Sequence, residues 1–161
     1  MTRFMIVLLI LRLPVTAARA EWVLRSPEAS DDNGSAFVVN NQGHRLNIGC
    51  GNGGIIIISL TPDTRPDDLK FVGDGAVVYF QVDGGQPLQM PAKCGTRGCY
   101  QDFMLGGDPW PVSQMRAITS ALRAGSRVNV LLGSKTMSRF DLSGSSAALG
   151  GLATKTQCEG L

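Results

Sequence analysis

The four cysteines of the chain are the residues whose type and spacing most clearly suggest chemistry, either disulfide bonds or a redox or metal site. Cys50, Cys94, Cys99 and Cys158 allow three disulfide pairings. We favour Cys94 with Cys99, because the short loop between them holds two glycines and can bend to disulfide geometry. Cys50 would then pair with Cys158 and tie an early strand to the end of the chain.

A redox or zinc site is the alternative use of these cysteines. A thiol–disulfide exchange site usually has two residues between its cysteines, whereas Cys94 and Cys99 have four between them. A zinc site needs clustered cysteine and histidine ligands, and His44 is the single histidine of the chain. The structural disulfide is therefore the favoured interpretation, and we expect no metal and no cofactor.

His44 would also have to serve as the base of any Ser-His-Asp arrangement. It falls in a turn before a strand and no Gly-x-Ser-x-Gly elbow accompanies it, so we interpret it as a solvated turn residue. The acid pairs Asp31-Asp32 and Asp67-Asp68 could hydrolyse glycosides only if a cleft held carboxylates on both sides. The pattern predicts a protein that is not an enzyme.

Trp110 is the candidate partner-binding residue. It stands in the segment Gly106-Gly107-Asp108-Pro109-Trp110-Pro111, where the flanking prolines stiffen the chain. Tryptophan is enriched at binding hot spots, so a rigid, exposed Trp110 could anchor a partner. The alternative is that Trp110 plugs the open end of a β-sandwich beside a helix.

Residues 1–20 have the layout of a secretory signal peptide. Arg3 is followed by the apolar run Phe4–Leu11, and Ala18-Arg19-Ala20 is a small-x-small cleavage site. The uninterrupted apolar part is too short for a membrane span of ~20 residues. We expect residues 21–161 to form one exported domain that is periplasmic or secreted, has disulfides and has no membrane span.

Removal of the leader changes the charge of the chain. It lowers the number of basic residues from 15 to 12 against 13 acidic ones, so the formal charge passes from +2 to −1. The net charge then gives no support to nucleic-acid binding, and we expect no nucleic-acid partner.

The elements that must position these residues are mostly short strands. Runs rich in Val, Ile, Phe and Tyr alternate with turn residues such as Asp83-Gly84-Gly85, which predicts a mainly β, β-sandwich-like single domain. The nearly continuous apolar runs Ile55–Ile58 and Val77–Val82 predict strands buried on both faces. The expected strands are Trp22–Arg25, Ala36–Asn40, Arg45–Cys50, Ile55–Leu60, Ala76–Val82, Cys99–Leu105, Arg127–Leu132 and Thr136–Asp141.

One or two helices are expected in the C-terminal half. Val112, Met115, Ile118 and Leu122 recur at helical spacing and form one apolar stripe, and Gly125 could end this helix. A second, shorter helix is expected from about 145 to 153, where two glycines each lower helix stability by ~1 kcal/mol relative to alanine.

The second half of the chain carries a set of short motifs. They are Cys94, Gly98-Cys99, a helix closing on Leu122 and Gly125, and Phe140-Asp141-Leu142-Ser143-Gly144 followed by Ala147, Ala148, Leu149 and Leu152. Over about residues 76–158 this pattern resembles the invasion-associated locus B family of small exported proteins of Gram-negative bacteria. Its C-terminal part also resembles small periplasmic accessory proteins of the type VI secretion apparatus. The resemblance implies an exported β-rich domain without a known catalytic residue, and a role in host-cell entry or in secretion.

The sequence thus predicts a non-enzymatic interaction or accessory protein of the bacterial cell envelope that binds a protein partner. One alternative is a hydrolase of envelope polymers in which Asp83 and Asp102 face one cleft. Another is a secreted enzyme inhibitor that inserts the Trp110 loop into an enzyme cleft.

Overall fold

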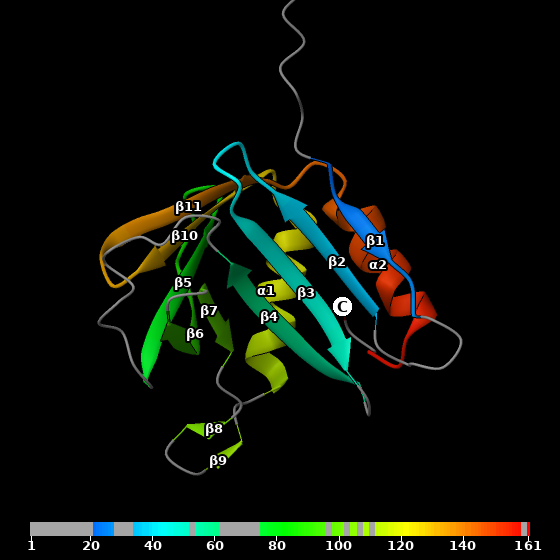
Figure 1. Cartoon of the computed structure of the whole chain (residues 1–161), viewed down its shortest axis with the longest axis horizontal. Coiled ribbons are helices and arrows are strands. Elements are labelled where there is room, and N and C mark those ends of the chain that lie inside the picture. Colours follow the sequence, from blue (N-terminus) through cyan, green and yellow to red (C-terminus); the bar gives the residue numbers. More distant parts are fainter. Residues whose placement is uncertain are drawn as a thin grey trace, which may run out of the picture.

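The computed structural model describes residues 21–27, 34–51, 54–61, 75–95, 98–101, 104–105, 108–109, 112–158 and 161. Within these residues nine strands form one antiparallel sheet in the order β1-β2-β3-β4-β7-β6-β5-β10-β11, and two short strands, β8 and β9, form a separate pair (Figure 1). The strands of the large sheet are β1 (Val23–Arg25), β2 (Gly34–Val39), β3 (Arg45–Gly51), β4 (Ile55–Thr61), β5 (Ala76–Val82), β6 (Leu88–Gly95), β7 (Gly98–Gln101), β10 (Arg127–Leu132) and β11 (Lys135–Asp141). The pair consists of β8 (Met104–Leu105) and β9 (Asp108–Pro109).

One face of the large sheet is buried and the other faces outward, because successive side chains of a strand point to opposite faces. In β4, Ile56 and Ile58 are buried whereas Ile55 is 50% exposed and Ile57 is half-buried. In β5, Val78 is fully buried and the alternate residues are half-buried. The expectation that these two strands are buried on both faces is therefore wrong. Both helices pack on the inner face, and the outer face of these strands remains partly open.

The two helices are α1 (Val112–Ala124) and α2 (Ser145–Lys155). Helix α1 contacts β5 and β6, α2 contacts β1 and β2, and the helices contact each other (Figure 1). Met115, Ile118 and Leu122 of α1 are buried as the stripe predicted, but Val112 is 60% exposed because it opens the helix. The prediction of a mainly β domain with helices in its C-terminal half is confirmed.

Strand β6 was missed by the sequence analysis because it contains Pro91, and proline is a signal against a strand interior. Pro91 pairs in register with Val77 of β5. On the other side of β6, the described pairing with β7 runs from Ala92 to Gly95.

The sheet curves until the turn between β2 and β3 meets the edge strand β11. Asn40 Nδ2 donates hydrogen bonds to Ser138 Oγ (3.0 Å) and to the carbonyl oxygen of Arg139 (3.1 Å). Six strands lie between β2 and β11 in the sheet order, so only a strongly coiled sheet brings them together. The curvature wraps the sheet around a single buried core, which is the sandwich-like feature of the domain.

Candidate functional site

The four cysteines form two disulfides. Cys50 is bonded to Cys158 with a Cα–Cα distance of 5.9 Å, and Cys94 is bonded to Cys99 with a Cα–Cα distance of 4.1 Å. This is the pairing that the sequence analysis favoured among the three. Cys94 and Cys99 are direct register partners in β6 and β7. All four cysteine residues are buried, so the sulfur atoms stabilise the fold from inside.

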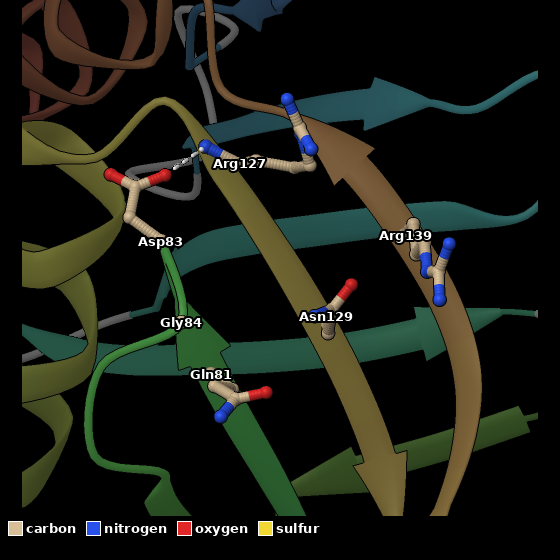
Figure 2. A pocket seen from close by; sticks show the side chains of 6 residues that line it. All are labelled: Gln81, Asp83, Gly84, Arg127, Asn129 and Arg139. Atoms are coloured by element: carbon tan, nitrogen blue, oxygen red, sulfur yellow. Dashed lines mark hydrogen bonds between the residues drawn. The ribbon is translucent and has the colours of Figure 1, made fainter.

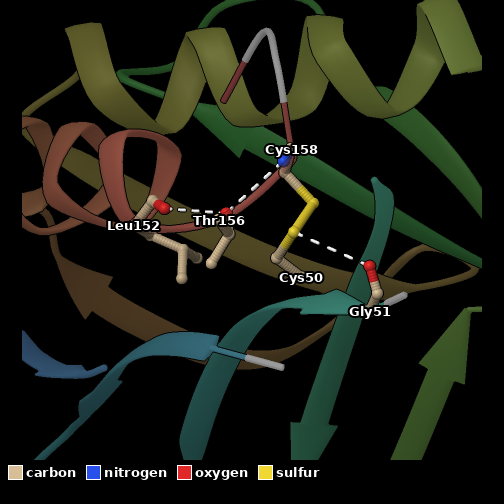
Figure 3. The surroundings of a disulfide bond; sticks show 5 residues. All are labelled: Cys50, Gly51, Leu152, Thr156 and Cys158. Atoms are coloured by element: carbon tan, nitrogen blue, oxygen red, sulfur yellow. Dashed lines mark hydrogen bonds between the residues drawn. A yellow bond between two sulfur atoms is a disulfide. The ribbon is translucent and has the colours of Figure 1, made fainter. Parts of the chain in front are cut away.

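The chain that follows α2 is held against β3 by the Cys50–Cys158 disulfide (Figure 3). Thr156 Oγ1 donates a hydrogen bond to the carbonyl oxygen of Leu152 (2.8 Å), and the Cys158 N–H donates to Thr156 Oγ1 (3.4 Å). Thr156 thus satisfies a backbone carbonyl at the end of α2 and directs the chain toward Cys50.

Several residues singled out by the sequence lie outside the described residues. Trp110 is among them, although the strands β8 and β9 that precede it are described, so its role as a partner anchor stays a prediction. The other positions outside are the leader 1–20 and the acidic residues Asp31, Asp32, Asp67, Asp68 and Asp102.

His44 is not the solvated turn residue that the sequence indicated. It is half-buried, and its Nδ1 atom lies 2.5 Å from Ser138 Oγ in β11. Asn40 Oδ1 accepts hydrogen bonds from the Gln42 N–H (3.0 Å) and the His44 N–H (2.9 Å), which fixes the turn. Ser138 is only 2% exposed. The contact joins a turn to an edge strand, and the Ser138 hydroxyl is out of reach of an external substrate.

A polar hollow of about 470 Å³ opens on the outer face of the sheet where β5, β10 and β11 lie side by side (Figure 2). Asn129 of β10 pairs in register with Gln81 of β5 and with Arg139 of β11, so the three side chains form one row across three strands. Arg127 lies two residues before Asn129 on the same face, and its side chain runs toward β11. The residues that line the polar hollow are Gln81, Asp83, Gly84, Arg127, Asn129 and Arg139.

Asp83 shapes one end of the polar hollow. It stands in the turn that follows β5 at φ 48°, with Gly84 at φ 75°, and this positive-φ turn was predicted from the sequence. The two oxygen atoms of its carboxylate accept hydrogen bonds from the backbone N–H groups of Ser126 and Arg127, both at 2.9 Å. The carboxylate therefore pins the start of β10 to the end of β5. The alternative that pairs Asp83 with Asp102 stays untested, because Asp102 lies outside the described residues.

An apolar hollow of about 420 Å³ lies next to the polar hollow on the same face. Its floor holds Tyr79 of β5 and Leu131 of β10, which pair in register. Tyr79 lies two residues before Gln81, and Leu131 two residues after Asn129, so the two hollows follow each other along the same two strands. The residues that line the apolar hollow are Tyr79, Pro87, Leu131, Gly133 and Ser134.

Sequence reasoning missed both hollows. Their residues are ordinary outward positions of predicted strands, and only the pairing of β5, β10 and β11 brings them together. One sequence signal could have indicated this face. Arg127 and Asn129 of β10, and Gln81 of β5, are polar residues at alternate positions of strands whose other positions are apolar.

In the described part of the chain, no three His, Cys, Asp or Glu residues are grouped so that they could hold a metal ion. Neither α1 nor α2, the helices that the structure describes, is long and apolar enough to cross a membrane.

Comparison of the chain with models of protein families, with curated proteins and with solved structures gave no match. The resemblance to the invasion-associated locus B family therefore stays a prediction, and the function has to be argued from the geometry of the outer face.

Proposed function

We propose that this chain is an exported, non-enzymatic binding protein of the bacterial cell envelope, and that it binds a protein partner through the outer face of β5, β10 and β11. The polar hollow is the observation that carries this proposal. Gln81, Asn129 and Arg139 project outward from three strands in fixed register, so their polar groups are positioned before any partner arrives. Side chains on paired strands are held more rigidly than side chains on loops.

The disulfides support export to the periplasm or beyond. Disulfide bonds persist in oxidising compartments such as the periplasm and are rare in the cytosol. Both bonds are buried, and Cys50–Cys158 joins parts of the chain that are 108 residues apart. A fold that includes such a bond suits a chain that carries a secretory leader over residues 1–20.

Two observations support binding rather than catalysis. The Asp83 carboxylate accepts two backbone hydrogen bonds and is held in the turn that it stabilises. Ser138, which contacts His44 in the manner of a serine–histidine pair, is 2% exposed and lies away from the polar hollow on the inner face. The Ser138 hydroxyl is not presented to a ligand as a nucleophile would be, and the Asp83 carboxylate at the end of the polar hollow is already bound by two backbone N–H groups.

The composition of the outer face suits a protein partner. Arginine and tyrosine are enriched among the residues that dominate protein–protein binding energy, and Arg127, Arg139 and Tyr79 lie together here. The partner would be an envelope or host-surface protein, in line with the accessory role in invasion or secretion that the resemblance implies.

Expression of the full chain in a Gram-negative host tests the export part of the proposal. We expect intact mass measurement to show cleavage after Ala20, fractionation to place the product in the periplasm or the medium, and all four cysteines to be inert to a thiol reagent before reduction. A cytosolic product with the leader uncut and four reactive thiols would overturn the proposal.

A photo-crosslinking amino acid tests the binding part. Placed at Asn129, it should give one discrete protein adduct on envelope preparations, and excess unlabelled protein should compete the adduct away. The matched control carries the same amino acid at Arg116, an exposed position on α1 that lies away from the outer face. Equal labelling from Asn129 and Arg116 would contradict the proposed surface, and release of soluble fragments from envelope polymers by the purified protein would contradict a non-enzymatic role.

A further inference from the structure

We propose that the outer face binds an extended acidic segment of the partner, in which a carboxylate residue occupies the polar hollow and an apolar residue two positions away occupies the apolar hollow. This inference rests on the proposed binding function and specifies the chemistry that the partner must present. The sequence alone did not predict either hollow.

The polar hollow is suited to a carboxylate. Arg127 and Arg139 are both exposed and each carries a planar guanidinium group, which can donate two parallel hydrogen bonds to one carboxylate. Figure 2 shows the side chain of Arg127 directed toward the strand that carries Arg139. The Asn129 amide lies beside Arg139 in the row, two residues after Arg127, and can donate to a carboxylate oxygen or accept from a peptide N–H.

Two acidic side chains stand near these arginines, and each accepts hydrogen bonds from the backbone. Asp83 accepts hydrogen bonds from the backbone of Ser126 and Arg127. Asp141, the register partner of Arg127, accepts a hydrogen bond from the Ser143 N–H at 2.7 Å. The residues that line the polar hollow include two arginines and one aspartate, a formal charge of +1, on a domain whose formal charge is −1 without its leader, and this favours an acidic ligand in the hollow.

The apolar hollow suits one apolar side chain. The Tyr79 ring and the Leu131 side chain form a register pair on the outer face, and Pro87 closes one side. Burial of an aliphatic side chain against such a surface contributes affinity in proportion to the apolar area removed from water. The carboxylate then fixes the orientation of the partner segment, because in any other orientation the carboxylate would lose its arginine partners.

The spacing of the hollows selects the spacing of the ligand. The step from Gln81 to Tyr79, or from Asn129 to Leu131, is two residues along a strand, which is roughly 6.8 Å at ~3.4 Å per residue. Side chains i and i+2 of an extended segment point to the same side at the same distance. An extended partner segment of the pattern acid-x-apolar therefore matches both hollows at once.

Over β5 and β10 the partner segment must be held by side chains, because these two strands are each paired on both sides and offer no free backbone edge for strand addition, whereas β11 ends the sheet. The specificity of the site consequently depends on Arg127, Arg139 and Tyr79. Their substitution should reduce binding without removing any strand pairing.

Three heptapeptide probes test the pattern on the purified, disulfide-bonded protein. The probes are acetyl-TTDTLTT-amide, its neutral form acetyl-TTNTLTT-amide, and acetyl-TTDLTTT-amide, which has the composition of the first and places the acid and the leucine on opposite sides. We expect the first probe to shift the side-chain amide NMR signals of Gln81 and Asn129. It should bind at least ~10-fold more tightly than the neutral form, since a charge-assisted bidentate contact is lost, and more tightly than the rearranged one.

Matched variants locate the binding energy. Arg139→Gln and Arg127→Gln should each weaken the first probe several-fold and lower the salt dependence of binding. Tyr79→Ala should weaken the first probe and leave its preference over the neutral form intact. Arg116→Gln on α1 removes the same charge at a distance and should change nothing. Retained amide spectra would show that each variant is folded.

Three outcomes overturn the inference. Equal affinity for the acidic and neutral probes would show that the site does not recognise a carboxylate. Equal affinity for the first and rearranged probes would show that the two-residue spacing does not matter. If trigalacturonic acid shifts the NMR signals and none of the peptides does, the ligand is an acidic sugar and not a peptide. The polar hollow would then still be a binding site. Absence of all shifts together with no adduct from Asn129 would defeat the proposed function as well.

Discussion

His44 Nδ1 lies 2.5 Å from Ser138 Oγ, and the two residues are 94 positions apart in the chain. Asn40 Nδ2 donates to the same hydroxyl oxygen, so the Ser138 hydroxyl connects the Asn40 amide with the His44 ring. Asn40 also donates to the carbonyl oxygen of Arg139. The β2–β3 turn therefore covers part of an edge strand that would otherwise present its backbone for pairing with another chain.

Removal of the Ser138 hydroxyl should destabilise the domain. Ser138→Ala leaves the Asn40 amide and the His44 imidazole without their shared partner, so we expect the free energy of unfolding to fall by about 1–3 kcal/mol. Urea denaturation under non-reducing conditions measures the change. Ser146→Ala, on the exposed face of α2, is the control and should stay within about 0.5 kcal/mol of the parent. An unchanged midpoint for Ser138→Ala would show that the contact does not stabilise the fold.

The two disulfides should contribute unequally to stability. In the loop-entropy description, Cys50–Cys158 closes a loop of over 100 residues and stabilises by about 4–5 kcal/mol, while Cys94–Cys99 stabilises by about 2 kcal/mol. Replacing each pair by two alanines avoids leaving a free thiol. Thermal and urea unfolding of the two double variants should show the larger loss for Cys50 and Cys158. The reverse order would mean that packing around the short loop outweighs chain entropy.

Asp83 should act as a link between β5 and β10 rather than as a catalytic acid. Asp83→Gly keeps the positive φ accessible and removes both carboxylate hydrogen bonds, so we expect a loss of about 1.5–3 kcal/mol. Asp83→Ala should lose about 1–2 kcal/mol more, because a left-handed backbone is unfavourable for a residue with a Cβ. Hydrogen exchange at the Ser126 and Arg127 amides should quicken in both variants. Unchanged exchange at these two amides would contradict the link.

The two adjacent glycines of α2 should respond differently to alanine. A Cβ at Gly150 would meet only Arg123 Nη2 at 3.8 Å, so Gly150→Ala should stabilise the protein by up to about 1 kcal/mol through helix propensity. A Cβ at Gly151 would come within 2.8 Å of Leu24 Cδ2 in β1, so Gly151→Ala should gain less or destabilise. Thermal unfolding of the two variants measures which substitution stabilises the protein more. A larger gain in stability for Gly151→Ala would disprove the close approach of β1.

Strand positions were predictable where local chemistry dominates. Asp83-Gly84 and Gly133 adopt the positive φ that their sequence indicated, and the flanking β-branched runs form strands. Pro91 obscured β6, because proline is a signal against a strand interior, whereas here Pro91 pairs in register with Val77. Burial of β4 and β5 was overestimated, since local hydrophobicity does not reveal which face the helices cover.

The outer face was not predictable, because it depends on register. Gln81 and Arg139 are far apart in the sequence and reach one row only through Asn129, which pairs with both. A shift of one residue in either pairing would turn Gln81 or Arg139 to the inner face and break the row. His44 was misjudged for the same reason, since its partner Ser138 lies on a distant strand.

The long disulfide also imposes an order on maturation. In a chain exported during synthesis, as proposed above, Cys50 would enter the oxidising compartment 108 residues ahead of Cys158, with two other thiols emerging in between. At a synthesis rate of ~5–20 residues per second, Cys50 would wait roughly 5–20 s for its partner. The β6–β7 hairpin places Cys94 opposite Cys99, so on that proposal the two thiols would bond during the interval and would no longer compete when the last thiol arrives.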